Sequence, residues 1–171
     1  MVRGDLLDSL NEFFLQISYL VCTKNNHLRL LHCASYRYKD ENIILVGNKN
    51  SGKSRFVQEK AIDNYHIYAD DLLIWTKNTT FVSLGLPLRI RRENIQDKQL
   101  IKKNFLVGKN ILYSHINSFD LAKFGDEFEL DKLLLMMPNY SPEQVSLLNT
   151  FKVIKKFIID ENLYTIKRKI R

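Results

Sequence analysis

The most extended apolar pattern in the chain lies near its N-terminus. Five large apolar side chains recur there every three or four positions: Leu6, Leu10, Phe13, Ile17 and Leu20. This spacing places them on one face of an α-helix, so the pattern predicts an amphipathic helix over residues 4–23. We expect this face to pack against the rest of the protein, and the polar pair at 25–26 to end the helix.

Shorter patterns in the middle of the chain predict β-structure. Apolar runs that are rich in β-forming residues and bounded by polar turns are typical of strands. They predict strands at residues 28–38, 43–46, 66–69, 72–75, 80–84, 110–115 and 132–137, and an extended segment at 86–92. Helices are expected at residues 53–64 and 96–104, so strands dominate the middle of the chain and helices its ends.

A further helix is expected to begin at Ser141. The serine can cap the helix, Pro142 suits its first position, and Gln144 follows the serine by three residues. Apolar side chains at helical spacing then mark the expected buried stripe of this helix: Leu147, Phe151, Ile154 and Ile158.

The chemically most informative segment follows the predicted strand at 43–46 and opens the predicted helix at 53–64. It matches the pattern G-x-x-x-x-G-K-[ST], in which backbone N–H groups and a helix N-terminus bind phosphate oxygens. In such loops the lysine, here Lys53, reaches the terminal phosphates, and the hydroxyl of Ser54 binds Mg²⁺. The pattern therefore predicts a nucleoside triphosphate site made by Gly47, Asn48, Lys49, Asn50, Ser51, Gly52, Lys53, Ser54 and Arg55.

Two adjacent carboxylates, Asp70 and Asp71, follow Lys53 by 17 and 18 positions. A short helix and a short strand fill this gap, and we expect that strand to lie beside the one that carries the loop. Its end would bring both acids next to the loop. One can hold Mg²⁺ with Ser54, and the other can accept a proton from an attacking hydroxyl. The alternative is a polar turn between two strands.

These features together resemble the HPr kinase/phosphorylase family, whose members have a phosphoenolpyruvate-carboxykinase-like fold. The resemblance rests on His32, the loop at 47–54 and the sequence Ala69-Asp70-Asp71, at spacings similar to those of the family. The segment at 86–91 also looks like one in smaller, kinase-like members. The resemblance covers roughly residues 28–160. It implies an α/β fold: a single P-loop domain with a mixed β-sheet and helices at both chain ends.

The resemblance also implies an activity, which is ATP-dependent transfer of the γ-phosphate to a hydroxyl group. The acceptor would be a Ser or Thr of a peptide or protein, or a small molecule, and the cofactors would be ATP and Mg²⁺. Lys53 and Asp70 would be catalytic, with Asp70 as the base, whereas Asp71 would bind the metal with Ser54. His32 would be a further catalytic residue near the phosphates, although it can equally be a hydrogen-bonded strand residue.

Arg89 is a candidate for phosphate or substrate binding, and a solvent-exposed strand edge is its alternative. The chain departs from the family at Lys49-Asn50, where Ser-Gly is usual. It also lacks the second metal-binding motif and the glycine- and lysine-rich loop of the bifunctional enzymes, so phosphorolysis is not expected. Two other functions remain open: a nucleotide-binding regulatory or partner-binding protein, and a simple nucleoside triphosphatase.

Composition limits the remaining choices. With 171 residues, 45% of them hydrophobic, the chain is expected to form one domain, with a core at 28–160 and a basic tail at 161–171. The net charge of +7 is spread along the chain, so a nucleic-acid partner is not expected. Two cysteines and the absence of a signal peptide or long apolar segment predict a cytoplasmic protein without a membrane partner. The family resemblance makes a homo-oligomer a further possibility.

Overall fold

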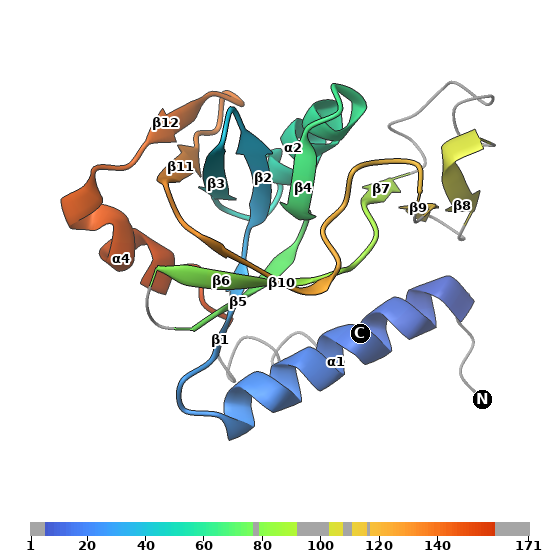
Figure 1. Ribbon diagram of the computed structural model, residues 1–171, viewed down its shortest axis with the longest axis horizontal. Helices are drawn as coiled ribbons and strands as arrows, with labels where there is room; N and C mark the ends of the chain where they lie inside the picture. The colour runs from blue at the N-terminus through green and yellow to red at the C-terminus, as the bar shows by residue number, and fades with distance from the viewer. Residues whose placement is uncertain (1–5, 77–78, 92–102, 108–110, 116, 160–171) are drawn as a thin grey trace.

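The computed structural model describes residues 6–76, 79–91, 103–107, 111–115 and 117–159. Within these ranges the protein is a mixed α/β fold with three helices and three β-sheets (Figure 1). The helices are α1 (Leu6–Lys24), α2 (Lys53–Ile62) and α4 (Leu147–Lys155). None of the described helices is long and apolar enough to cross a membrane.

The largest sheet has five strands in the order β12-β11-β3-β2-β4, and it is mixed because β11 and β3 are parallel whereas their neighbours are antiparallel. A four-stranded antiparallel sheet has the order β1-β5-β6-β10, and a three-stranded sheet the order β7-β9-β8. The strands are β1 (Arg29–His32), β2 (Ala34–Tyr38), β3 (Glu41–Val46), β4 (His66–Ala69), β5 (Leu72–Trp75), β6 (Thr80–Leu84), β7 (Arg89–Arg91), β8 (Phe105–Val107), β9 (Ile111–Ser114), β10 (Phe124–Glu129), β11 (Lys132–Met136) and β12 (Pro142–Gln144).

The chain passes between the two larger sheets at two neighbouring points. The chain passes from β1 in the four-stranded sheet to β2 in the five-stranded sheet at Cys33, and from β4 to β5 in the reverse direction at Asp70 and Asp71. The backbone N–H of Cys33 donates to the carbonyl of Asp71 at 3.0 Å, which ties the two crossings together. Both predicted acids therefore lie where the two sheets diverge.

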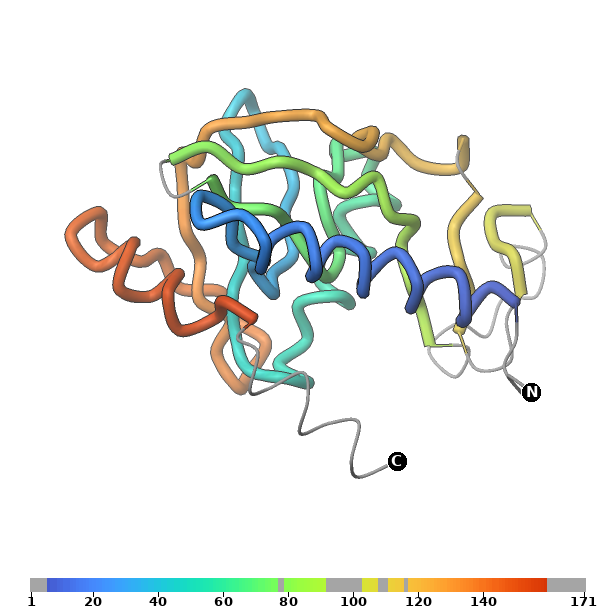
Figure 2. The backbone as a smooth tube through the Cα atoms, turned by 90° about the horizontal axis from the view of Figure 1, so that it is seen from below, coloured from blue at the N-terminus to red at the C-terminus, as the bar shows by residue number. Residues whose placement is uncertain are grey.

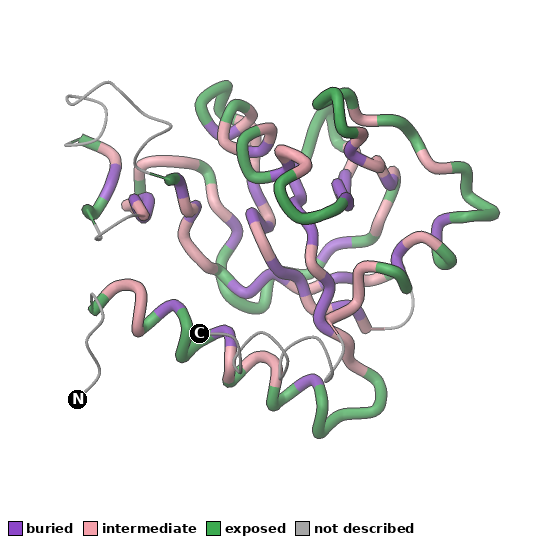
Figure 3. The backbone as a smooth tube through the Cα atoms, turned by 180° about the vertical axis from the view of Figure 1, so that it is seen from behind, coloured by how far each residue is buried: buried purple, intermediate pink, exposed green. Residues whose placement is uncertain are grey.

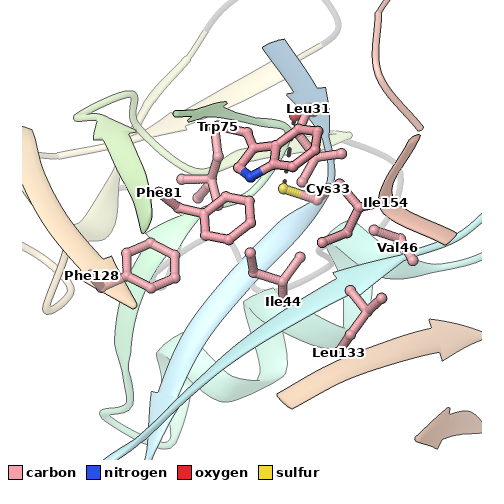
Figure 4. Packing of buried hydrophobic residues seen from close by; sticks show 11 residues of the cluster. Leu31, Cys33, Ile44, Val46, Trp75, Phe81, Phe128, Leu133 and Ile154 are labelled. Atoms are coloured by element: carbon pink, nitrogen blue, oxygen red, sulfur yellow. Dashed lines mark hydrogen bonds between the residues drawn. The ribbon is translucent and has the colours of Figure 1, made fainter. Parts of the chain in front are cut away.

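Alternation of side chains along the strands builds four layers, because successive residues of a strand point to opposite faces. One face of the four-stranded sheet packs against α1, which lies in front of the strands in Figure 2. The other face packs against the five-stranded sheet. The far face of the five-stranded sheet packs against α2. The central interface between the sheets is drawn in Figure 4, where buried side chains from both sheets meet around Ile44, Phe81 and Cys33, together with Ile154 of α4.

The helix predicted over residues 4–23 is present as α1, but the face predicted to be buried is wrong. The apolar residues Leu6, Leu10, Phe13, Ile17 and Leu20 are all exposed. The helix instead packs through Asn11, Leu15 and Cys22, and Figure 3 shows exposed positions recurring along its whole length. Periodicity located the helix, but the five-residue stripe is not the side that meets the sheet.

The C-terminal helix is also shifted from its predicted start. Residues 142–144 form strand β12, which pairs with the edge of β11, and α4 begins only after its N-cap residue Ser146. The open backbone edge of β11 therefore outcompetes the capping sequence at Ser141. Of the predicted stripe, Ile154 is buried and Ile158 is partly buried, whereas Leu147 and Phe151 are exposed.

Other element predictions differ in detail. The strand expected at 28–38 is divided at Cys33 between two sheets, and three strands, β8, β10 and β12, were not predicted. Strand β4 does not lie beside β3 as expected, because β2 lies between them. The described residues form three sheets rather than one mixed sheet. Most of the helix predicted at 96–104, and the tail at 161–171, lie outside the described residues.

Candidate functional site

The loop at residues 47–54, which we call the glycine loop, connects the end of β3 to the start of α2. Two of its residues adopt the left-handed region of backbone conformation: Gly52 with φ 95° and Asn50 with φ 65°. Asparagine enters this region more readily than most residues. Asn50 therefore supports a turn at the position where the resembled family usually has glycine.

Gly52 is required for a second reason. A Cβ atom added there would lie 2.3 Å from Cδ1 of Tyr140, which is closer than any real contact. The ring of Tyr140 thus packs directly on the loop backbone, from the connection between β11 and β12. Sequence reasoning missed Tyr140, because the long-range pairing of β11 with β3 brings it to the loop.

Lys53 is a buried charged residue enclosed by the loop itself. Its side-chain Nζ donates to the carbonyl oxygens of Gly47 at 2.9 Å and Asn48 at 3.1 Å. Burial lowers the pKa of Lys53, against the opposing effect of Cys33, Asp71 and Asp70. The loop therefore holds a desolvated ammonium group at its centre, which is the group that an anionic ligand would neutralise.

Asp70 is buried just after the end of β4, and its two carboxylate oxygens differ in their contacts. Its Oδ2 accepts the backbone N–H of Arg89 at 3.0 Å, whereas Oδ1 has no hydrogen-bond partner among the described residues. The hydroxyl of Ser54 lies 3.5 Å from the carbonyl oxygen of Asp70. Burial raises the pKa of Asp70, although the contacts from Arg89 and Ser54 act in the opposite direction. The unpaired oxygen marks a place where a proton or cation would bind favourably.

Asp71 is in a different electrostatic environment. One oxygen pairs with Nε2 of His32 at 3.3 Å, and the other pairs with the guanidinium group of Arg89. Burial alone would raise the pKa of Asp71, but the His32 hydrogen bond and the charges of Arg89, His32 and Lys53 outweigh it and hold the pKa below its usual value. Adjacent in sequence, the two aspartates therefore differ: Asp71 stays ionised, and Asp70 binds a proton more readily.

The structure brings most of the predicted site residues into one cleft of about 500 Å³. Gly47 and Asn48 do not line it, but their carbonyl oxygens hold Lys53. Three residues that the sequence did not single out also line the cleft: Gln58, Ile111 and Tyr140. Arg91, for which a phosphate-stabilising role was left open beside that of Arg89, lines it as well. The predicted residues that line it are His32, Lys49, Asn50, Ser51, Gly52, Lys53, Ser54, Arg55, Asp70, Asp71 and Arg89.

The side chains present fit a magnesium ion that is bound mainly by phosphate. Among the described residues, no three His, Cys, Asp or Glu side chains are grouped as a metal-binding cluster. Magnesium at nucleotide sites needs only one or two carboxylates beside the phosphates, and it retains several water ligands. The unpaired Oδ1 of Asp70, the ionised Asp71 and the nearby hydroxyl of Ser54 are oxygen donors of the kind that Mg²⁺ prefers.

Comparisons with known proteins add no family assignment. A scan of the chain against models of protein families found no match, and a sequence search of curated proteins found no significant one. The cleft is therefore the feature of this chain that bears most directly on its function.

Proposed function

We propose that the cleft binds a magnesium-bound nucleoside triphosphate and that the protein is an ATP-dependent kinase with a hydroxyl-bearing acceptor. The observation that carries this proposal is the meeting of the glycine loop with Asp70 and Asp71 in one cleft. Lys53 would contact the terminal phosphates, and the backbone N–H groups at the start of α2 would bind phosphate oxygens. When bound, Mg²⁺ would neutralise phosphate charge, held by Ser54 and Asp71.

Asp70 is the better candidate for the base. A base must be able to hold the proton that it accepts, and burial raises the pKa of Asp70 towards that condition. Its Oδ1 is also unpaired among the described residues. The carboxylate of Asp71 is already paired with His32 and Arg89, which favour its ionised form, so Asp71 suits a role in which it stays negatively charged. His32 and Arg89 then act chiefly by fixing the position of Asp71.

One observation favours the second candidate function, a nucleotide-binding regulatory protein without transfer activity. Both oxygens of Asp71 are already engaged by protein groups, so a metal ion must share or displace those contacts. Such a protein would bind nucleotide and change its affinity for a partner, but it would release no ADP above background. The thiols of Cys22 and Cys33 are buried and free. They support the proposal that the protein, whether kinase or regulatory protein, acts in a reducing compartment such as the cytoplasm.

The experiment combines calorimetry with a transfer assay. Mg·ATP and Mg·GTP are titrated into the wild type, and [γ-³²P]ATP is then incubated with the protein and cell extract, with labelled species identified by mass spectrometry. We expect Asp70→Asn to bind nucleotide but to transfer phosphate at least about a hundredfold more slowly. The matched control is Asp40→Asn, an exposed aspartate in a turn away from the cleft.

The outcomes separate the candidates. Binding of neither nucleotide by the wild type would overturn the proposal as a whole. Binding without a labelled acceptor or ADP release would favour the regulatory protein, and ADP release without an acceptor would favour a simple nucleoside triphosphatase. Transfer by Asp70→Asn at the wild-type rate would contradict the assignment of the base.

A further inference from the structure

The outer face of α1 is a large exposed apolar surface, which we call the α1 seam. Seven side chains form it, with exposed fractions between 40% and 71%: Leu6, Leu10, Phe13, Phe14, Ile17, Leu20 and Val21. Since large apolar side chains present about 150–250 Å² each when fully accessible, the seam exposes on the order of 700 Å². The largest apolar patch on a typical monomer is only about 300–600 Å². A surface of this size indicates that something covers it.

The spacing of the seam is that of a coiled coil. Its central positions advance in alternating steps of four and three residues, which is the 3.5-residue period that keeps one stripe facing a partner helix. These positions are Leu6, Leu10, Phe13, Ile17 and Leu20, and the next one, at the end of the helix, is the charged residue Lys24. A helix that only needs to cover a sheet does not require this regularity on its solvent side.

The orientation of α1 is fixed by the opposite side of the helix. Leu15 and Cys22, seven residues apart, pack into the cluster below the four-stranded sheet. Asp8 lies seven residues before Leu15 and accepts a hydrogen bond from the hydroxyl of Tyr113. Rolling the helix to bury the seam would break this polar contact and expose Leu15, so the seam is presented outward.

We propose that the α1 seam pairs with the same seam of a second copy of this chain. Its exposed area is close to the roughly 800 Å² that each partner contributes to a standard interface. The helix positions beside the central ones carry no charge, so the apolar part of the seam meets its copy without repulsion between like charges: Leu7, Phe14 and Val21 on one side, and Ser9, Gln16 and Thr23 on the other. A membrane surface is a poorer partner, because an interfacial helix needs a basic polar face and α1 carries Asp8 and Glu12 with only Lys24.

The test is the molar mass of the full chain in solution, measured by sedimentation equilibrium over a concentration series. We expect the wild type to form dimers. Phe13→Glu should raise the dimer dissociation constant at least about a hundredfold, because it places a carboxylate in the apolar seam. Leu20→Glu provides an independent second variant. The matched control is Phe124→Glu, which changes a more exposed phenylalanine on β10 and should leave the dimer intact.

Circular dichroism and urea unfolding establish that each variant is folded. A wild type that stays monomeric at all concentrations would overturn the proposal, and so would a dimer that Phe13→Glu and Leu20→Glu leave unchanged. Sedimentation of the monomeric wild type with anionic phospholipid vesicles would overturn it in favour of a lipid surface. The result does not depend on whether the cleft binds a nucleotide.

Discussion

The cleft and the outer side of α1 both reverse the usual distribution of polar and apolar groups, but in opposite directions. The cleft buries an ammonium group and a carboxylate, Lys53 and Asp70, whereas α1 exposes a row of leucine and phenylalanine side chains. Neither arrangement stabilises an isolated folded chain, since buried charges lose hydration and exposed apolar groups gain nothing from folding. This difference matches the two partners that we propose: a small charged ligand in the cleft and an apolar surface on the helix.

The largest expected effect comes from removing the buried charge of the cleft. Lys53→Met should weaken Mg·ATP binding about a thousandfold or more, because the ammonium group is the cation at the centre of the loop. Its effect on the free energy of unfolding should be far smaller, since losing a desolvated charge offsets losing its two hydrogen bonds. Calorimetry and urea unfolding measure the two quantities. The control Lys152→Met, on the exposed side of α4, should change neither.

The inner side of α1 should behave in the opposite way to its outer side. Leu15→Ala removes a buried leucine from the cluster with Leu30 and Leu72, so it should lower the free energy of unfolding by about 2–3 kcal/mol. Leu148→Ala, at a leucine of α4 that is 97% exposed, should change it by less than about 0.5 kcal/mol. Equal effects of the two substitutions in urea unfolding would mean that α1 is not docked on the sheet.

A smaller effect is expected in the pH dependence of stability. Burial raises the pKa of Asp70, so the folded protein binds this proton more tightly than the unfolded chain does, and stability should fall as pH rises from 3.8 through the raised pKa. Asp70→Asn should remove this decline. The lowered pKa of Asp71 acts oppositely: its contribution is lost as pH falls through the folded value, and it should persist in Asp70→Asn. Urea unfolding between about pH 3 and pH 8 tests both directions.

The smallest effect is expected at the rim of the cleft. Tyr140→Ala removes the ring that packs on Gly52, so the loop would have to be ordered by the ligand instead. We expect nucleotide affinity to fall about fivefold, which corresponds to ordering one or two side chains. Tyr140→Phe keeps the ring and should bind as the wild type does. A normal affinity for Tyr140→Ala in the same titration would show that the ring does not order the loop.

The sequence predicted the segments better than their arrangement. The glycine loop, the helix after it and the two aspartates were all found, because each depends on residues within a short stretch of chain. The prediction of the buried face of α1 was wrong, because its most regular apolar stripe is not the side that meets the sheet. The pairing of β12 with β11 overrode the capping sequence at Ser141, and no local pattern records such long-range pairing. Tyr140 joins the cleft through tertiary contacts alone, whereas Gln58 lies one helical turn after Ser54 on α2, so the predicted helix could have placed it there.

The double crossing of the chain at Cys33 and Asp71 has a mechanical consequence. Because the two segments change sheets side by side and are joined by a backbone hydrogen bond, sliding one sheet over the other would bend both at once. The distance between the two aspartates and the glycine loop is therefore fixed by the main chain and not by side-chain contacts. Replacing side chains in the cleft can alter its chemistry while leaving that distance unchanged.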